Sequence, residues 1–167
     1  MKLVIHGYVR SFWVVCALWA LAACTTGQVV DHAFTFDVLS DSPGVELLDY
    51  RYGDSRFPAA SNPAHHREKG TALQRINISG RMVRGDSLYV KWRSKATGQV
   101  FEETADLHHR LPSDISGHRL YFMIQADRLY VYLIPPESKK RPAESPPNGP
   151  RMYRDLDVVT IYQERKR

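Results

Sequence analysis

Residues 120–134, LYFMIQADRLYVYLI, form the most strongly patterned segment of the chain. Two apolar runs flank Gln125, Ala126 and Asp127, and this spacing is typical of a tight β-hairpin. Alternate residues of each run would share a face, because side chains along a strand point to opposite sides in turn. One face holds Leu120, Phe122, Ile124, Leu129, Val131 and Leu133, and the other holds Tyr121, Met123, Tyr130, Tyr132 and Ile134. Both faces are apolar or aromatic, so we expect a central antiparallel pair that is covered on both sides.

The same period-two alternation continues on either side of this hairpin. It recurs in residues 34–38, 48–52 and 88–93, and further candidate strands are 73–83, 99–107 and 157–162. Together with the hairpin these make about eight strands, while no segment of helical length keeps a 3.6-residue period. We therefore expect an all-β fold, an antiparallel sandwich or a small barrel, with little helix.

Two loops interrupt the pattern. Residues 53–70 contain two prolines and show no periodicity, and residues 135–150 hold six of the ten prolines in the chain. We expect both loops to be exposed, the second as an extended polyproline-like connector. A proline-rich segment can also serve as a docking ligand, and this alternative stays open.

The N-terminus has the pattern of an export signal. Lys2 and Arg10 are its only full charges before residue 24, and residues 11–23 (SFWVVCALWALAA) are apolar apart from the first. A membrane-spanning helix needs about 20 apolar residues, so this run of about 13 favours a cleaved signal over a permanent span. The run ends in Leu21-Ala22-Ala23-Cys24, which resembles the lipobox of bacterial lipoproteins.

The resemblance implies how the chain is processed and held. Cleavage would fall between Ala23 and Cys24, Cys24 would receive a diacylglycerol thioether, and its new amino group would be acylated. Residues 1–23 are then a signal peptide, residues 24–32 a lipidated tether, and residues 33–167 a single β domain.

The expected partner is a membrane, reached through the lipid on Cys24. Thr25 and Thr26 stand where inner-membrane lipoproteins of enterobacteria tend to carry Asp, so the resemblance favours the periplasmic face of the outer membrane in a Gram-negative cell. Two small basic clusters at 139–141 and 165–167 are most simply a solvated loop and tail, and attraction to anionic lipid head groups is the alternative.

Composition limits the class of the mature domain. Removal of residues 1–23 from the 167-residue chain leaves 144 residues, which is one ordinary domain. Of the two cysteines, Cys16 leaves with the signal and Cys24 carries lipid, so this domain must rely on its core rather than on disulfides. The mature chain has 21 Lys and Arg against 18 Asp and Glu, and such a mild excess does not favour nucleic acid as a partner.

Histidines and carboxylates invite an interpretation as a metal or catalytic site. The pairs His65-His66 and His108-His109 come without a spaced carboxylate or a cysteine ligand, and two neighbours on one strand would point apart. Glu102 and Asp106 share a strand face but lie about 13 Å apart, farther than a glycosidase pair. Nucleophile motifs and phosphate-binding loops are missing. We therefore predict no enzyme activity, no catalytic residue, no cofactor and no metal.

The eight tyrosines of the mature chain are the last sequence feature that could indicate a function. They suit strand packing first, a protein interface second, and a glycan or small-ligand site third. The sequence thus favours a lipid-anchored envelope lipoprotein with a binding or structural β domain and a possible envelope protein partner. Two alternatives stay open: an accessory lipoprotein of an envelope-spanning secretion or assembly machine, and an envelope hydrolase with an unrecognised site.

Overall fold

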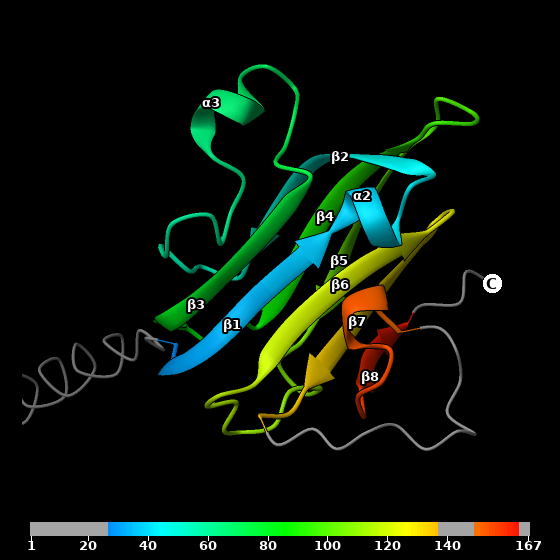
Figure 1. The fold of residues 1–167 in the computed structure, drawn as a ribbon. Coiled ribbons are helices and arrows are strands. Elements are labelled where there is room, and N and C mark those ends of the chain that lie inside the picture. Colours follow the sequence, from blue (N-terminus) through cyan, green and yellow to red (C-terminus); the bar gives the residue numbers. More distant parts are fainter. Residues whose placement is uncertain (1–26, 137–148, 164–167) are drawn as a thin grey trace, which may run out of the picture.

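The described chain forms a two-layer β-sandwich (Figure 1). A computed structural model describes residues 27–136 and 149–163. Its strands are β1 Val29–Asp37, β2 Val45–Tyr52, β3 Arg75–Val83, β4 Ser87–Ser94, β5 Val100–Asp106, β6 Arg119–Gln125, β7 Arg128–Ile134 and β8 Val159–Gln163. The helices are only short turns: α2 Val38–Asp41, α3 Ala64–Arg67 and the 3-10 helix η1 Arg151–Tyr153. The prediction of an all-β fold of about eight strands is confirmed, in the form of a sandwich.

One sheet has five strands and the other has three. The five-stranded sheet has the order β3-β1-β6-β7-β8 and the three-stranded sheet the order β2-β4-β5. All pairings are antiparallel except β1 with β6, where the chain returns from the other sheet to pair beside its first strand. In Figure 1 the five-stranded sheet faces the viewer and the three-stranded sheet lies behind it.

The hairpin of β6 and β7 lies inside the larger sheet, as its two apolar faces predict. The strands pair from Arg119 with Ile134 to Gln125 with Arg128, leaving a two-residue turn at Ala126 and Asp127. The face of Leu120, Phe122, Ile124, Leu129, Val131 and Leu133 belongs to the central core. The opposite face, with Tyr121, Met123, Tyr130, Tyr132 and Ile134, forms a second buried cluster. The hairpin is therefore covered on both sides.

Aromatic side chains fill the space between the sheets. Phe34 of β1 stacks on Tyr52 of β2 with ring centroids 4.8 Å apart, and Phe36 meets Tyr50 edge-on at 4.8 Å. Trp92 of β4 is 1% exposed, and its indole Nε1 donates to the carbonyl oxygen of Ala126 at 3.2 Å. This bond joins the three-stranded sheet to the turn of the β6–β7 hairpin.

Two predicted features of the domain differ in the structure. Strand β1 begins at Val29, so the tether expected at 24–32 overlaps the domain, and Val30 and His32 are already buried. Loop 53–70 is not wholly exposed, because Ala60 and Asn62 are buried. The loop packs on β3, where Gly80 leaves room for a Phe57 ring that a Cβ would meet at 3.1 Å.

The other predicted loop, 135–150, lies mostly outside the described residues, although its last residue, Pro150, is buried. None of the short helices in the described ranges has the length and apolar character that crossing a bilayer requires.

Candidate functional site

Cys24 is the one residue to which the sequence assigns a role. It lies outside the described residues, as do the basic clusters at 139–141 and 165–167. Lipidation of Cys24 therefore stays a prediction.

The two histidine pairs lie in different parts of the molecule. His65 and His66 belong to α3, and their ring centroids are 4.4 Å apart. Strand β5 ends at Asp106, so His108 and His109 lie in a turn, where their rings also come within 4.4 Å. The strand geometry that would separate them does not apply there. Within the described ranges, no group of three or more His, Cys, Asp or Glu side chains is placed to hold a metal ion.

The acidic residues of β5 are divided between two faces of the sheet. Glu102 lies outside, where its carboxylate accepts a hydrogen bond from Tyr89 Oη at 3.2 Å. Glu103 is the register partner of Val90, a fully buried residue of β4, and so points toward the core. Asp106 accepts from the backbone N–H of His108 at 2.9 Å.

Most tyrosines pack inside the sandwich or against a sheet. Six of the eight tyrosines in the described residues are buried: Tyr50, Tyr52, Tyr121, Tyr130, Tyr132 and Tyr162. Only Tyr89 and Tyr153 keep partial exposure. This agrees with packing as their main role and directs attention to the surroundings of these two.

Tyr89 lies in a groove of about 410 Å³ on the outer face of the three-stranded sheet. A β-bulge between Leu47 and Asp49 in β2 adds Leu48 to the apolar lining of this groove, to which Val100 of β5 also belongs. Its other lining side chains are charged: Asp49, Arg67, Lys91 and Arg93. Arg67 comes from α3, so loop 53–70 supplies one wall.

The charged side chains of this face form ion pairs that are exposed to solvent. Arg93 Nη1 lies 3.0 Å from the carboxylate of Glu46, and Lys91 Nζ lies 3.7 Å from that of Glu102. Exposed pairs of this kind contribute about 0–1 kcal/mol each, so a partner can replace them at little cost. Burial, and secondly the Glu102 carboxylate, raise the pKa of Tyr89, which keeps its hydroxyl protonated as a donor.

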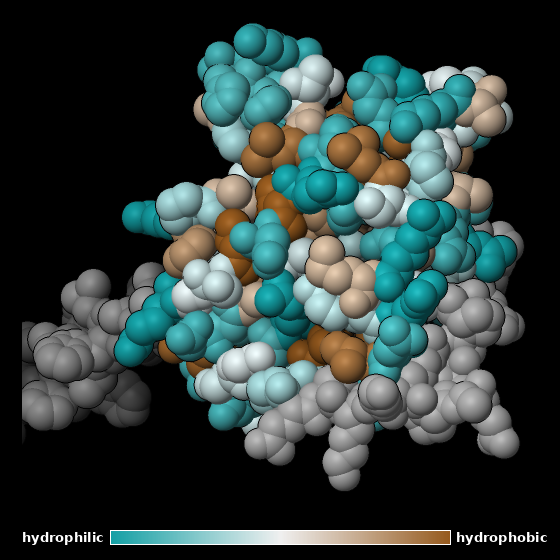
Figure 2. Space-filling model, viewed as in Figure 1, coloured by the Kyte–Doolittle hydropathy of each residue, from teal (hydrophilic) through white to brown (hydrophobic). Residues whose placement is uncertain are grey.

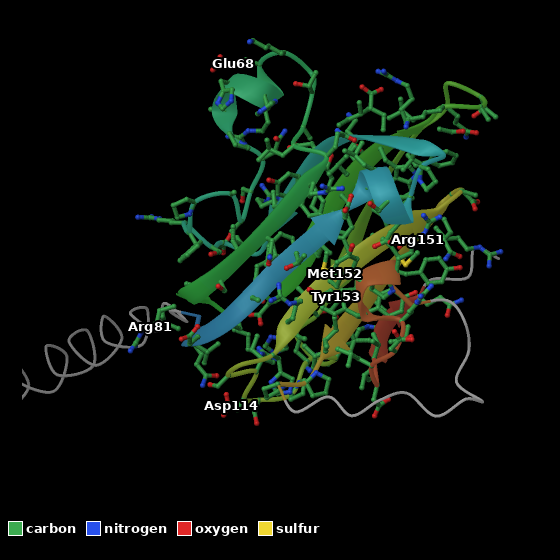
Figure 3. All side chains as sticks on the ribbon, in the orientation of Figure 1. Glu68, Arg81, Asp114, Arg151, Met152 and Tyr153 are labelled. Atoms are coloured by element: carbon green, nitrogen blue, oxygen red, sulfur yellow. The ribbon has the colours of Figure 1, made fainter. Side chains whose placement is uncertain are left out.

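The part of the outer face of the five-stranded sheet that β6 and β7 form is instead covered by the chain itself. Residues 149–158, here called the cover segment, run across it and contain η1 (Figures 1 and 3). Tyr153, Leu156 and Val158 pack on the second buried cluster. Figure 2 shows that hydrophobic residues on this face lie in small groups between hydrophilic ones.

Asp41, at the end of α2, fastens the cover segment. Its carboxylate accepts from Tyr121 Oη at 2.5 Å and from the backbone N–H of Arg151 at 3.0 Å. Burial, and secondly the bond to Asp41, raise the pKa of Tyr121. The ring of Tyr153 then packs edge-on against Tyr121, with centroids 5.7 Å apart.

Arg119 forms a polar centre on the same face. Its Nη1 donates to Thr35 Oγ1 at 2.5 Å and to Asn77 Oδ1 at 2.6 Å. Its guanidinium carbon lies 5.6 Å from the centroid of the Tyr153 ring. Beside it a pocket of about 280 Å³ opens between the starts of β1 and β6.

Neither the role of Arg119 nor that of Asp41 was evident from the sequence. The available signal was the place of Arg119 directly before the 120–124 run, on the face that also carries Tyr121 and Met123. A charge at that position of a doubly covered strand requires polar partners. Those partners lie far away in sequence, so local pattern could not identify them.

Comparisons with known proteins supply no further identity: no family model, no curated protein and no solved structure matches this chain.

Proposed function

We propose that this protein is a lipid-anchored lipoprotein of the cell envelope whose β-sandwich serves as a binding module at the membrane surface. The observation that carries the proposal is the short distance between Cys24 and Val29, where β1 begins. The four residues between them reach at most about 14 Å. A lipid on Cys24 would therefore hold the folded domain directly beside the bilayer.

The difference between the two outer faces supports a binding role. The cover segment lies over β6 and β7 of the five-stranded sheet, whereas the described residues leave the charged groove of the three-stranded sheet open. The groove carries charges of both signs, held only by weak ion pairs. These suit an envelope protein partner with complementary charges, because charged side chains guide association and select among partners.

Lipid attachment is tested with a metabolic fatty-acid label and mass spectrometry of the expressed chain. Cys24→Ala should abolish incorporation of the label and leave a precursor that keeps residues 1–23. Cys16→Ala is the matched control, because Cys16 lies in the same apolar run but outside the predicted cleavage motif. An unmodified N-terminus at another residue would show that the chain is not a lipoprotein.

The binding face is tested by a photo-activated cross-linker in place of Tyr89 in the anchored protein. A discrete adduct should form and should disappear when Lys91 and Arg93 are both changed to Glu. The control cross-linker replaces Asp127, in the β6–β7 turn. An adduct that is unaffected by both charge reversals would place the binding surface elsewhere.

A further inference from the structure

We infer that the pocket beside Arg119 binds a phosphate group. This site lies on the five-stranded sheet and is separate from the groove of the proposed function. The inference rests on the fixed orientation of Arg119, on the absence of a carboxylate partner for it within the described ranges, and on the donors that surround the pocket.

The guanidinium of Arg119 is held in place before any ligand arrives. Its two hydrogen bonds, to Thr35 and Asn77, come from β1 and β3 and use only Nη1. The Tyr153 ring of the cover segment lies against the same guanidinium (Figure 3). A preorganised arginine loses little side-chain entropy when an oxyanion binds.

The positive charge of Arg119 is not neutralised by its protein contacts. Thr35, Asn77 and Tyr153 are all neutral, and no ion pair to Arg119 is found within the described ranges. Its Nε and Nη2 donate no hydrogen bond to any described residue. A half-buried arginine that is bound only by neutral groups retains both a charge and free donors for an anion.

Two further polar side chains line this pocket, and one of them can donate. Ser79 of β3 lines it, and its hydroxyl makes no hydrogen bond within the described ranges. His118 also lines it, with Nδ1 3.0 Å from the carbonyl oxygen of Ser116. A carbonyl only accepts, so Nδ1 carries a proton and, in the neutral ring, Nε2 is an acceptor. His118 therefore shapes the wall of the pocket and adds no donor to it.

The wall that carries His118 is fixed to β1. The backbone N–H of Ala33 donates to the His118 carbonyl at 2.9 Å, and that of Gly117 donates to the Asp31 carbonyl at 2.8 Å. Gly117 has a φ of +70°, which the turn requires and which favours glycine. Among the described residues that line the pocket, Asp31 is the one carboxylate, and its register partner on β3 is the oppositely charged Arg81.

The donors of Arg119 and Ser79 come from two different strands, β6 and β3, and this arrangement favours phosphate over carboxylate. A phosphate group offers at least three acceptor oxygens in different directions, whereas a carboxylate offers two in one plane. The volume of about 280 Å³ suits a head group or a small phosphate ester rather than a large ligand. The phosphate could belong to a soluble ester or to an anionic phospholipid, and the experiment distinguishes these sources.

The test is a titration of the full chain in zwitterionic detergent micelles with inorganic phosphate, at constant ionic strength, followed by amide NMR. We expect saturable shifts at Ser79, Gly117 and His118. Arg119→Gln should weaken binding about tenfold or more, because a charge-assisted hydrogen bond is lost. Arg128→Gln is the matched control, since it removes the same charge at the opposite end of the hairpin.

Ser79→Ala should weaken binding severalfold and keeps the test decisive if Arg119→Gln does not fold. Two results with the native protein would overturn the inference: no saturable shifts with phosphate, or tighter binding of succinate than of phosphate. Two results with variants would also overturn it: equal effects of Arg128→Gln and Arg119→Gln, or unchanged affinity in Ser79→Ala. For the source, phosphatidylglycerol is added to the micelles. Arg119-dependent shifts at the same amides would assign the site to a lipid head group, and shifts only with free phosphate would assign it to a soluble ester.

Discussion

At the scale of single residues, Trp92 is the side chain whose removal should lower the free energy of unfolding the most. It is 1% exposed, stacks on Phe101 with centroids 5.7 Å apart, and bonds to the hairpin turn of the other sheet. Trp92→Ala should lower the free energy of unfolding by about 3–5 kcal/mol, because it leaves a large cavity. Urea unfolding measures this. Met152→Ala, at a position that is 69% exposed, should change it by less than about 0.5 kcal/mol.

His32 should make the stability of the fold depend on pH. Burial lowers the pKa of His32 below its usual 6.5, against smaller opposing contributions from the Val30 carbonyl and from Asp31. Its Nδ1 lies 3.0 Å from that carbonyl and its Nε2 lies 3.1 Å from Tyr52 Oη. Burial also raises the pKa of Tyr52 to about 12, so this hydroxyl stays protonated and donates to Nε2. Neutral His32 therefore satisfies both contacts.

The sign of the effect follows from proton uptake. Below pH 6.5 the unfolded chain protonates His32 while the folded chain still excludes the proton, so the free energy of unfolding falls as the pH falls. Melting temperatures between pH 8 and pH 5 should show this decline, and His32→Gln should flatten it. His65→Gln, in α3 on the surface, is the control. A native profile that stays flat below pH 6.5 would contradict the prediction.

At the scale of elements, the attachment of the cover segment depends on the bond between Tyr121 and Asp41. Tyr121→Phe should lower the free energy of unfolding by about 1.5–3 kcal/mol, because the buried carboxylate of Asp41 loses a hydrogen-bond donor. Hydrogen exchange at Arg151, whose backbone N–H also bonds Asp41, should then become faster. Tyr130→Phe changes the same buried face at a hydroxyl with no hydrogen bond in the described ranges, and should leave this exchange nearly unchanged. Equal exchange in both variants would show that apolar packing alone holds the segment.

The strands were predictable from the sequence, whereas the connections between them were not. Each predicted strand overlaps an observed one, because alternate burial on a half-covered sheet imposes a period of two residues. The parallel pairing of β1 with β6 joins segments about 80 residues apart, and only tertiary packing selects it. The cover segment was missed for a similar reason, since its three apolar contacts, Tyr153, Leu156 and Val158, show no regular period.

The candidate sites, like the fold, were predictable only where they depend on local sequence pattern. Tyrosine enrichment indicated packing correctly, but it could not distinguish partly exposed Tyr89 and Tyr153 from the six buried tyrosines. The groove depends on a β-bulge at Leu48, and the polar centre depends on Thr35 and Asn77 meeting Arg119. Both features depend on contacts between residues that are far apart in the sequence, and the periodicity of a single strand cannot predict such contacts.

At the scale of the whole molecule, the proposed anchor would fix which end of the sandwich faces the membrane. Strand β1 begins beside the end of β3, because Val29 is the register partner of Val83. The β6–β7 turn lies at the other end of the sheet, since β6 runs parallel to β1 (Figure 1). Arg119, the first residue of β6, pairs with Ala33, four residues after Val29, and β6 then adds seven residues. At about 3.3 Å per residue the two ends lie roughly 35 Å apart.

A fluorophore placed at either end should therefore meet lipid to different degrees. Arg81→Cys labels the end of β3, which Figure 3 shows beside the start of β1, and Asp127→Cys labels the hairpin turn. A lipidated Cys24 leaves no other thiol in the mature chain, so each label is unique. In vesicles with a nitroxide at the lipid head group, quenching at residue 81 should be severalfold stronger than at residue 127. Removing residues 1–24 should abolish the difference, because the domain then has neither the lipid nor the apolar run 11–23 to hold it at the bilayer. Equal quenching of the two labels in the lipidated protein would mean that the sandwich lies on its side.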